Sequence, residues 1–201
     1  MIGVVDYGAG NLGSVMNALE RLDLPARFAA GPEELGADSP FERVIFPGDG
    51  HFATAMAKLE EAGWAGALRD WVRADRPFLG ICIGLQLLFS SSEEAPGVAG
   101  LGLFEGEVKR FPLRKVPQIG WNSTVAREGS RLFADIPQGS FFYYIHSYYC
   151  QAAVADEACA RAEYGLEYTS AVERGRVCAV QFHPEKSGET GLALINNWAR
   201  M

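Results

Sequence analysis

One pattern occurs three times before residue 90: a short apolar run, a turn that contains glycine, and then an amphipathic stretch. The three units span residues 2–22, 43–72 and 77–89, and the helix of the second unit is expected to be interrupted at Gly63 and Gly66. Such short apolar runs indicate buried strands, and the amphipathic stretches indicate helices. The chain is therefore predicted to be a three-layer α/β protein, with a mostly parallel sheet and helices on both faces. The glycine turns should meet at the carboxyl edge of the sheet, where such sheets bind ligands.

After Gly100 the sequence changes to short β-like runs, which include residues 141–145 and 176–182, before a last helical stretch at about residues 190–198. These runs predict an antiparallel extension that makes the sheet mixed. The segments near residues 31–40 and 95–100 are expected to be loops, and both are too short to mark a domain boundary. Residues 1–201 are therefore expected to form a single domain, since a chain of this length can bury its own core.

Charge and cysteine spacing exclude several classes of function. A net charge of −7 and a pI near 5.0 argue against binding to nucleic acid, which needs lysine and arginine to neutralise phosphates. No apolar run approaches the roughly 18 residues of a membrane span, and the N-terminus carries no signal-type segment, so no membrane contact and a cytoplasmic location are expected. The four cysteines lack CxxC spacing, which argues against disulfides and against a bound metal.

Cys82 differs from the other three cysteines, which are interpreted as small apolar core residues. It is the middle residue of Gly80-Ile81-Cys82-Ile83-Gly84, which is the nucleophile-elbow pattern with cysteine in the serine position. The pattern lies where it is required, between a predicted strand and a predicted helix. The helix N-terminus would favour a thiolate, and the Ile83 N–H would be free to serve in an oxyanion hole. The alternative is a buried packing cysteine beside two turn glycines.

A thiolate nucleophile needs a base, and the chain has only His51, His146 and His183. His183 follows an apolar run, so it should lie at the carboxyl end of a strand on the same edge as Cys82. Pro184 restrains His183 to an extended conformation, in which residues 183 and 185 point to the same side. Glu185 can then hold the imidazole, which is the third role in a catalytic triad. Without the elbow, His-Pro-Glu would be an ordinary loop at a strand end.

A second oxyanion donor is expected from another turn on the same edge. The segment Pro47-Gly48-Asp49-Gly50 is the candidate, because its glycines let the backbone N–H groups of Asp49 and Gly50 approach a substrate carbonyl. By itself this segment is also a common turn.

The first glycine turn supports a competing interpretation. Residues 8–13 match GxGxxG after a strand, and Glu33 or Glu34 lies about 20 residues further on, as in a dinucleotide site. A nicotinamide-dependent enzyme is therefore an alternative, although it explains neither the elbow nor His-Pro-Glu.

With these residues in place, the sequence resembles the class I, or triad, glutamine amidotransferases over almost the whole chain. Cys82, His183 and Glu185 match that family's nucleophile, base and acid. The resemblance implies a flavodoxin-like fold, hydrolysis of glutamine to glutamate and ammonia through a cysteinyl thioester, and no metal or organic cofactor. It is strongest to the branch that serves histidine biosynthesis, and it is carried by residues 6–11, 47–50, 118–122, 144–149 and 182–187.

The resemblance also implies residues that hold the substrate, namely Gly48, Gln86, Glu94, His146, Ser147 and Tyr148. Gln86 and Glu94 could instead be a helix-surface residue and a loop charge, and His146 could be a structural histidine packed among tyrosines. Asp49 departs from the family pattern, which more often has a small apolar residue between those glycines.

In the resembled branch, ammonia passes to a cyclase subunit with a (β/α)₈ barrel in a heterodimer, which makes imidazole glycerol phosphate and an aminoimidazole carboxamide ribonucleotide. Asn11, Trp121 and Lys186 match positions at that interface. Their alternative roles are a helix cap, a core aromatic residue and a solvated lysine.

Two other functions compete with this one. The chain could be a triad glutaminase of another synthase, such as that of the pyridoxal phosphate pathway, but the Gly-Trp-Asn and His-Ser-Tyr-Tyr stretches favour the histidine branch. It could also be a non-catalytic or stress-type cysteine protein on a related fold, which should lack the His-Pro-Glu present here.

Overall fold

The computed structural model describes residues 1–8 and 10–201, so Ala9 of the 6–11 motif lies outside the described residues. At its centre are five parallel strands in the order β2-β1-β3-β4-β12. This is the strand order of flavodoxin-like sheets. The strands are β1 (Ile2–Val5), β2 (Ala26–Ala29), β3 (Arg43–Phe46), β4 (Phe78–Ile81) and β12 (Val177–Val180). Every residue of β1, β4 and β12 is buried, as expected for strands that are covered on both faces.

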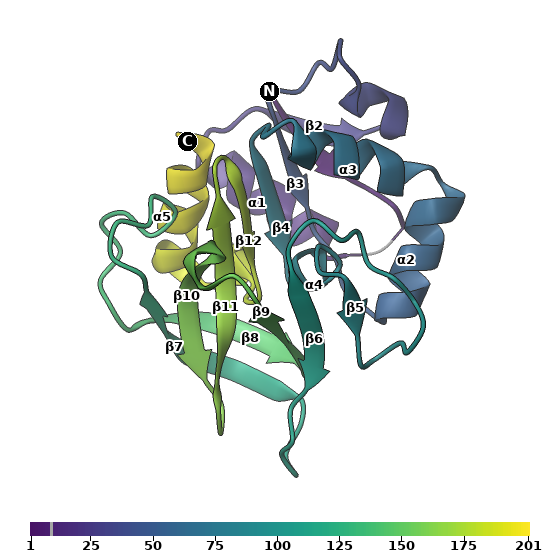
Figure 1. Cartoon of the computed structure of the whole chain (residues 1–201). Coiled ribbons are helices and arrows are strands. Elements are labelled where there is room, and N and C mark those ends of the chain that lie inside the picture. Colours follow the sequence, from purple (N-terminus) through teal and green to yellow (C-terminus); the bar gives the residue numbers. More distant parts are fainter. Residues whose placement is uncertain (9) are drawn as a thin grey trace.

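Helices cover both faces of the parallel strands (Figure 1). They are α1 (Leu12–Arg21) and α5 (Gly188–Ala199) on one face, and α2 (Phe52–Glu61) and α3 (Trp64–Arg73) on the other. Alternate residues of β3 enter two separate cores: Val44 and Phe46 join the α2 and α3 side, whereas Ile45 joins the α1 and α5 side. This alternation follows from the two-residue period of a strand. The three-layer α/β prediction is confirmed.

The antiparallel extension begins at β12 and continues through β11, β10, β7 and β8. A side branch leads from β11 through β9 to β6 and β5. The strands of the extension are β5 (Ser91–Ser92), β6 (Gly106–Arg110), β7 (Gln118–Ala126), β8 (Ser140–His146), β9 (Tyr148–Ala152), β10 (Ala158–Glu163) and β11 (Glu167–Arg174). The predicted mixed sheet with an antiparallel extension is therefore confirmed.

Several local expectations need correction. The second helical stretch is interrupted at Gly63, which has a φ of 75° as the N-cap of α3, but Gly66 lies inside α3 and does not break it. The third helical stretch was expected to extend to Phe89, yet α4 (Ile83–Gln86) has four residues. The expected loop at residues 31–40 contains a short 3₁₀ helix, η1 (Pro32–Leu35), and two further 3₁₀ helices are η2 (Ala155–Glu157) and η3 (Pro184–Lys186).

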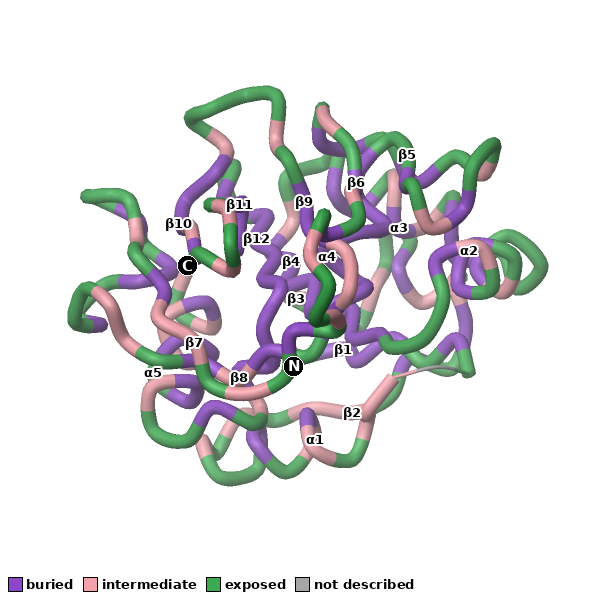
Figure 2. The backbone as a smooth tube through the Cα atoms, turned by 90° about the horizontal axis from the view of Figure 1, so that it is seen from below, coloured by how far each residue is buried: buried purple, intermediate pink, exposed green. Residues whose placement is uncertain are grey.

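The carboxyl ends of β1, β3, β4 and β12 meet at one edge, because these strands are parallel neighbours. Figure 2 shows these buried strands at the centre of the molecule, with the exposed segments around them. None of the helices formed by residues 1–8 and 10–201 has the length and apolar character needed to cross a membrane. The three glycine turns and His183 are thus placed on the same edge, as predicted.

Candidate active site

Cys82 lies on a strained turn between β4 and α4. Its φ of 56° and ψ of −108° are unusual for a residue other than glycine, and such a conformation persists only where the surroundings hold it. The Cys82 N–H donates to Val180 O at 2.8 Å, and the Cys82 carbonyl accepts from the N–H groups of Leu85 and Gln86. These bonds fix the peptide groups on both sides of the cysteine, and the segment has the geometry of a nucleophile elbow.

The glycines of the pentapeptide are required by close backbone packing. A Cβ atom at Gly84 would overlap with the carbonyl of Phe46, and one at Gly80 would lie 2.9 Å from Gly84 O. The elbow can therefore fit against β3 only with glycine at these positions. Because α4 is a single turn, its dipole supports a thiolate less than the sequence suggested. Ile83 is the first residue of α4, so its N–H has no acceptor within the helix.

His183 follows β12 and is paired with Glu185, at 2.8 Å between His183 Nδ1 and Glu185 Oε1. The predicted pairing is present, but the reason given for it is wrong. His183 is extended, with a φ of −102° and a ψ of 93°, whereas residues 184–186 form η3. The 3₁₀ turn, and not an extended segment, brings the carboxylate back toward the imidazole. Both side chains are nearly inaccessible to solvent, with relative exposures of 6% and 1%.

The charges around His183 favour its protonated form. Burial alone lowers the pKa of His183, but the nearby sulfur of Cys82, together with the carboxylate of Glu185, raises this pKa from its ordinary value of 6.5 to about 10. Nδ1 is occupied by Glu185, which leaves Nε2 for proton transfer, and Nε2 has no hydrogen-bond partner among residues 1–8 and 10–201. This environment suits a thiolate paired with an imidazolium.

A pocket of about 380 Å³ opens beside Cys82 and His183, and its size suits a small ligand. Most of the residues singled out from the sequence line it: Asn11, Asp49, Gly50, Cys82, Ile83, Gln86, Glu94, His146, Ser147, Tyr148, His183 and Lys186. Pro117 and Ile145 complete the wall. Gly48, Glu185 and Trp121 are not part of the lining: Gly48 packs against Ile83, and Glu185 lies behind His183.

Gln86 and Glu94 make contacts that a helix-surface residue or a loop charge would not make. Gln86 is 4% exposed, and its Nε2 donates to Tyr148 O at 3.1 Å and to Gln181 Oε1 at 3.1 Å. Glu94 Oε2 accepts from the N–H of Phe52, the first residue of α2, at 2.8 Å. Both side chains are thereby held in the wall of the pocket.

His146 also lines the pocket, but its ring nitrogens are already engaged. Nδ1 donates to Tyr148 O at 2.7 Å, and Nε2 lies 3.4 Å from the hydroxyl of Tyr168. The ring packs against Phe111 and Tyr144, and burial lowers the pKa of His146 to about 4, so the imidazole is neutral. These contacts favour the structural interpretation of His146 over a role in holding the substrate.

The Pro47–Gly50 turn lies next to the elbow. A Cβ atom at Gly48 would overlap with the side chain of Ile83, and Gly50 has a φ of 90°, which favours glycine. The Asp49 carboxylate accepts from the N–H of Gly10 at 2.9 Å, so this turn is bonded to the turn that follows β1. Asp49, which departs from the family pattern, therefore connects the Pro47–Gly50 turn to the turn that follows β1.

The predicted partner-facing residues differ in their surroundings. Trp121 is 57% exposed on β7, which excludes the alternative of a core aromatic residue. Asn11 is the N-cap of α1 but makes no side-chain cap hydrogen bond, and it borders the pocket. Lys186 is exposed at the mouth of the pocket.

Sequence reasoning missed three residues beside the site. Gln181 is completely buried next to Cys82, Ser187 bonds to the main chain of His183, and the Tyr7 hydroxyl is buried without a partner among the described residues. A signal existed for Gln181, because it is the polar residue in the apolar run that ends at Phe182. Tyr7 and Ser187 lie within the motifs that carry the family resemblance, but no residue pattern around them indicates a role in the site.

Comparison with known proteins gives consistent results. The family model described as glutamine amidotransferase class-I matches residues 3–200. The imidazole glycerol phosphate synthase subunit HisH of Moorella thermoacetica is 46% identical over 201 residues, with 100% of this chain and 94% of the relative covered. The protein of the same name from Deinococcus radiodurans is also 46% identical, with 98% of this chain and 92% of the relative covered.

Solved structures share the fold at lower identity. A crystal structure described as a glutamine amidotransferase has a TM-score of 0.76 and 22% identity, and the match covers 98% of each chain. The structure of PurLQS from Thermotoga maritima contains a chain with a TM-score of 0.76 and 17% identity, over 99% of this chain and 97% of that one.

Proposed function

The chain belongs to the class I glutamine amidotransferase family, and on that premise we propose that it is the glutamine-hydrolysing subunit of an imidazole glycerol phosphate synthase in histidine biosynthesis. Residues 1–201 would then act as a single glutamine amidotransferase domain. The observation that carries the proposal is the strained Cys82 in one pocket with the His183–Glu185 pair.

The proposed reaction uses the groups in that pocket. The Cys82 sulfur attacks the side-chain amide carbon of glutamine, and the C–N bond breaks as the imidazolium of His183 gives a proton to the departing ammonia. Water, deprotonated by His183, then attacks the thioester and expels the thiolate with glutamate. Glu185 holds the ring and stabilises the imidazolium at both stages. The free Ile83 N–H and the N–H groups of Asp49 and Gly50 are the proposed oxyanion donors.

The walls of the pocket suit the two ends of an amino acid. Glu94, Gln86, Ser147 and Tyr148 all line the pocket, and the Gln86 amide donates to Tyr148 O at 3.1 Å. A carboxylate and an amide oxygen can accept from an α-ammonium group, while main-chain N–H groups and hydroxyls can donate to an α-carboxylate. We therefore assign glutamine binding to Gln86, Glu94, Ser147 and Tyr148, and not to Gly48, which does not line the pocket.

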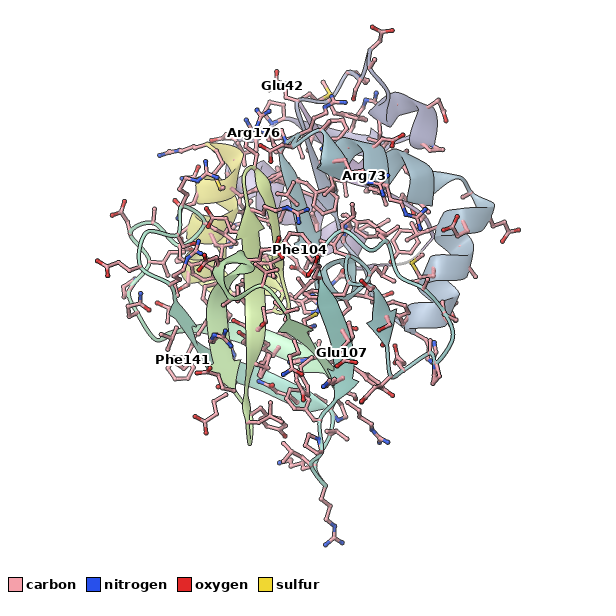
Figure 3. All side chains as sticks on the ribbon, in the orientation of Figure 1. Glu42, Arg73, Phe104, Glu107, Phe141 and Arg176 are labelled. Atoms are coloured by element: carbon pink, nitrogen blue, oxygen red, sulfur yellow. The ribbon has the colours of Figure 1, made fainter. Side chains whose placement is uncertain are left out.

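The outer face of β7 and β8 is the proposed docking surface for the cyclase subunit. Its exposed apolar residues are Ile119 (61%), Trp121 (57%), Val125 (58%), Phe141 (58%) and Ile145 (41%). The register brings Ile119 opposite Ile145 and Trp121 opposite Tyr143, so these side chains form one strip. Figure 3 shows Phe141 on the outside of the extension. A contiguous apolar face of this kind is typical of a protein interface.

The strip begins at the pocket, because Ile145 belongs to both. A (β/α)₈ cyclase seated on the strip, with Asn11 and Lys186 at its margin, would cover the mouth of the pocket. Ammonia released at Cys82 would then pass to the cyclase without entering bulk water. The cyclase would use it to form imidazole glycerol phosphate and the aminoimidazole carboxamide ribonucleotide.

The nicotinamide alternative loses one of its two candidate carboxylates. Glu34 is already engaged, because it forms a two-point bond with Arg27 and accepts from the N–H of Ala30. A glutaminase for a different synthase stays the second candidate, but the names of the 46% identical relatives favour histidine biosynthesis.

The test is glutamine hydrolysis by the purified chain, alone and with a purified cyclase and its nucleotide substrate. We expect the cyclase with its nucleotide to stimulate glutamate formation and ammonia to appear in imidazole glycerol phosphate. Glutamine hydrolysis that the cyclase and nucleotide leave unchanged would contradict the histidine assignment, and no hydrolysis under any condition would contradict the glutaminase itself.

A further inference from the structure

Gln181 is a buried amide between the proposed nucleophile and the pocket wall. It directly follows β12, it is 0% exposed, and its N–H donates to Ser170 O at 2.8 Å. Its side chain reaches Cys82 at one end, with 3.8 Å between Gln181 Nε2 and Cys82 Sγ. At the other end, Gln181 Oε1 accepts from Gln86 Nε2 at 3.1 Å.

The orientation of the Gln181 amide follows from the bonds made by Gln86. Gln86 Nε2 lies 3.1 Å from the main-chain oxygen of Tyr148, which can only accept, so this end of Gln86 must be the NH₂ group. Its second proton is directed to Gln181, which must therefore present its oxygen to Gln86. The NH₂ group of Gln181 is consequently turned toward the sulfur of Cys82.

A donor in this position favours a negative sulfur. A neutral thiol is a weak acceptor, whereas a thiolate accepts strongly, so a buried N–H directed at the sulfur is better satisfied by the anion. The same contact favours the second half of the reaction, in which the thioester breaks and the thiolate leaves. His183 gives a proton to ammonia in the first half of the reaction and takes one from water in the second. The hydrogen bond from Gln181 therefore leaves the proton balance unchanged.

We propose that Gln181 is a further catalytic residue, which donates a hydrogen bond to the Cys82 sulfur and holds it as an anion directed at the pocket. This inference rests on the proposed function for the reaction that the sulfur performs. Through Gln86, the same bonds connect the proposed substrate wall to the nucleophile, since Gln86 binds Gln181 at 3.1 Å. With both Nε2 protons used, the Gln86 oxygen is the atom that stays available to glutamine.

The experiment measures the rate at which iodoacetamide alkylates Cys82 as a function of pH, with the labelled cysteine identified by mass spectrometry. The variants are Gln181→Leu, which removes the donor, and Gln181→Glu, which keeps the size and the acceptor toward Gln86 but brings a negative charge to the sulfur. Gln118→Leu is the matched control, because Gln118 is a buried amide, 3% exposed, that bonds to Tyr168 away from Cys82.

In Gln181→Leu, we expect the alkylation profile to move to higher pH and the rate at neutral pH to fall about tenfold, the usual effect of losing a hydrogen bond to a charged group. Gln181→Glu should move the profile further in the same direction, and Gln118→Leu should not move it. A purely structural role for Gln181 would lower thermal stability without moving the profile. If the leucine variant does not fold, Gln181→Met, which has nearly the size of glutamine and no N–H donor, takes its place.

Unchanged profiles in folded Gln181 variants would overturn the proposal. The assay contains neither glutamine nor cyclase, so it still tests the contact between Gln181 and Cys82 if the proposed function is wrong. Conversely, normal alkylation profiles in the variants would leave the glutaminase assignment of the chain intact.

Discussion

The parallel and antiparallel halves of the sheet differ in how their strands are buried. Every residue of β4 and β12 is buried between helix layers, whereas β7 and β8 alternate between buried and exposed residues. The buried strands β4 and β12 hold Cys82 and His183 at their carboxyl ends, where the surroundings can sustain a strained turn. The outer face of β7 and β8 is instead apolar and exposed. The difference supports the proposed division of labour, with the nucleophile and base on the parallel strands and docking on β7 and β8.

The two halves meet at the His183 segment. The His183 N–H donates to Tyr143 O on β8 at 2.9 Å. Ser187 Oγ accepts from the Tyr143 N–H at 3.0 Å and donates to His183 O at 2.6 Å. Tyr143 in turn packs edge-on against Trp121 of the docking face. A partner bound at Trp121 would therefore be linked to the proposed base through Tyr143. We call the contacts among Tyr143, His183 and Ser187 the junction, and the following substitutions test the molecule on each side of it.

The largest effect is expected from Cys82→Ala, which removes the proposed nucleophile from the parallel half. Ammonia release from glutamine should fall by about 10⁶-fold, because no other group can form the thioester. Binding of the cyclase, measured by titration calorimetry, should be retained, since the docking face is intact. Cys159→Ala is the control, as Cys159 is buried in β10 and should leave the rate unchanged. A Cys82→Ala variant with normal hydrolysis would remove the triad from the account.

A smaller effect is expected from Glu185→Gln, which acts on the base. The raised pKa of His183 keeps the imidazolium of the wild type until the pH approaches about 10. Cys82 and Glu185 both raise this pKa, so without the carboxylate it should fall below about 10 and the alkaline decline in glutamine hydrolysis should move to lower pH. Between the alkaline limits of the two proteins the rate should drop by about 10²-fold, the lower range for general acid–base catalysis. An alkaline decline at the wild-type position would contradict the role of Glu185.

The same shift has a consequence for stability. A raised folded-state pKa contributes stability that is fully present below the unfolded value of 6.5 and is lost as the pH rises through about 10. The difference in unfolding free energy between wild type and Glu185→Gln should therefore shrink with increasing pH across this window. Urea unfolding of both proteins at several pH values measures this difference. A difference in unfolding free energy that grows with pH would contradict a raised pKa of His183.

The smallest effect is expected from Ser187→Ala at the junction. It removes the hydrogen bond that Ser187 Oγ accepts from β8 and the one that it donates to His183 O, each worth about 1 kcal/mol. Stimulation of hydrolysis by the cyclase should fall by about fivefold per lost bond, with little change in cyclase affinity. Ser39→Ala is the control, because the Ser39 hydroxyl accepts from the Phe41 N–H just before β3 and not from the junction. Equal stimulation in both variants would show that the junction does not couple cyclase binding to glutamine hydrolysis.

The parallel half was predictable because its signals are local. Short apolar runs and glycine turns mark β1, β3 and β4, and Gly80 and Gly84 mark an elbow that needs room for backbone contact. β2 was not predicted, since its residues are mostly half-buried at the edge of the sheet and lack a continuous apolar run.

The contacts between the halves could not be predicted from the sequence, because they depend on how distant segments are brought together. Gln181, Gln86 and Tyr148 are joined by hydrogen bonds across long stretches of chain, and no spacing rule connects them. The His183–Glu185 pair was predicted, but through an extended segment, whereas η3 produces it. Trp121 was foreseen at the interface only through the family resemblance, and its side chain is exposed.

The division of labour is tested most directly by Trp121→Asp, read by two assays on the same preparation, with Phe28→Asp on the distant strand β2 as the matched control. Loss of a central interface tryptophan should weaken cyclase binding by about 30-fold or more and reduce cyclase-stimulated glutamine hydrolysis with it. Alkylation of Cys82 in the free chain should stay at the wild-type rate, because Cys82 and His183 follow the parallel strands β4 and β12. A variant in which Cys82 alkylation falls, or in which cyclase stimulation is unchanged, would contradict the separation of chemistry from docking.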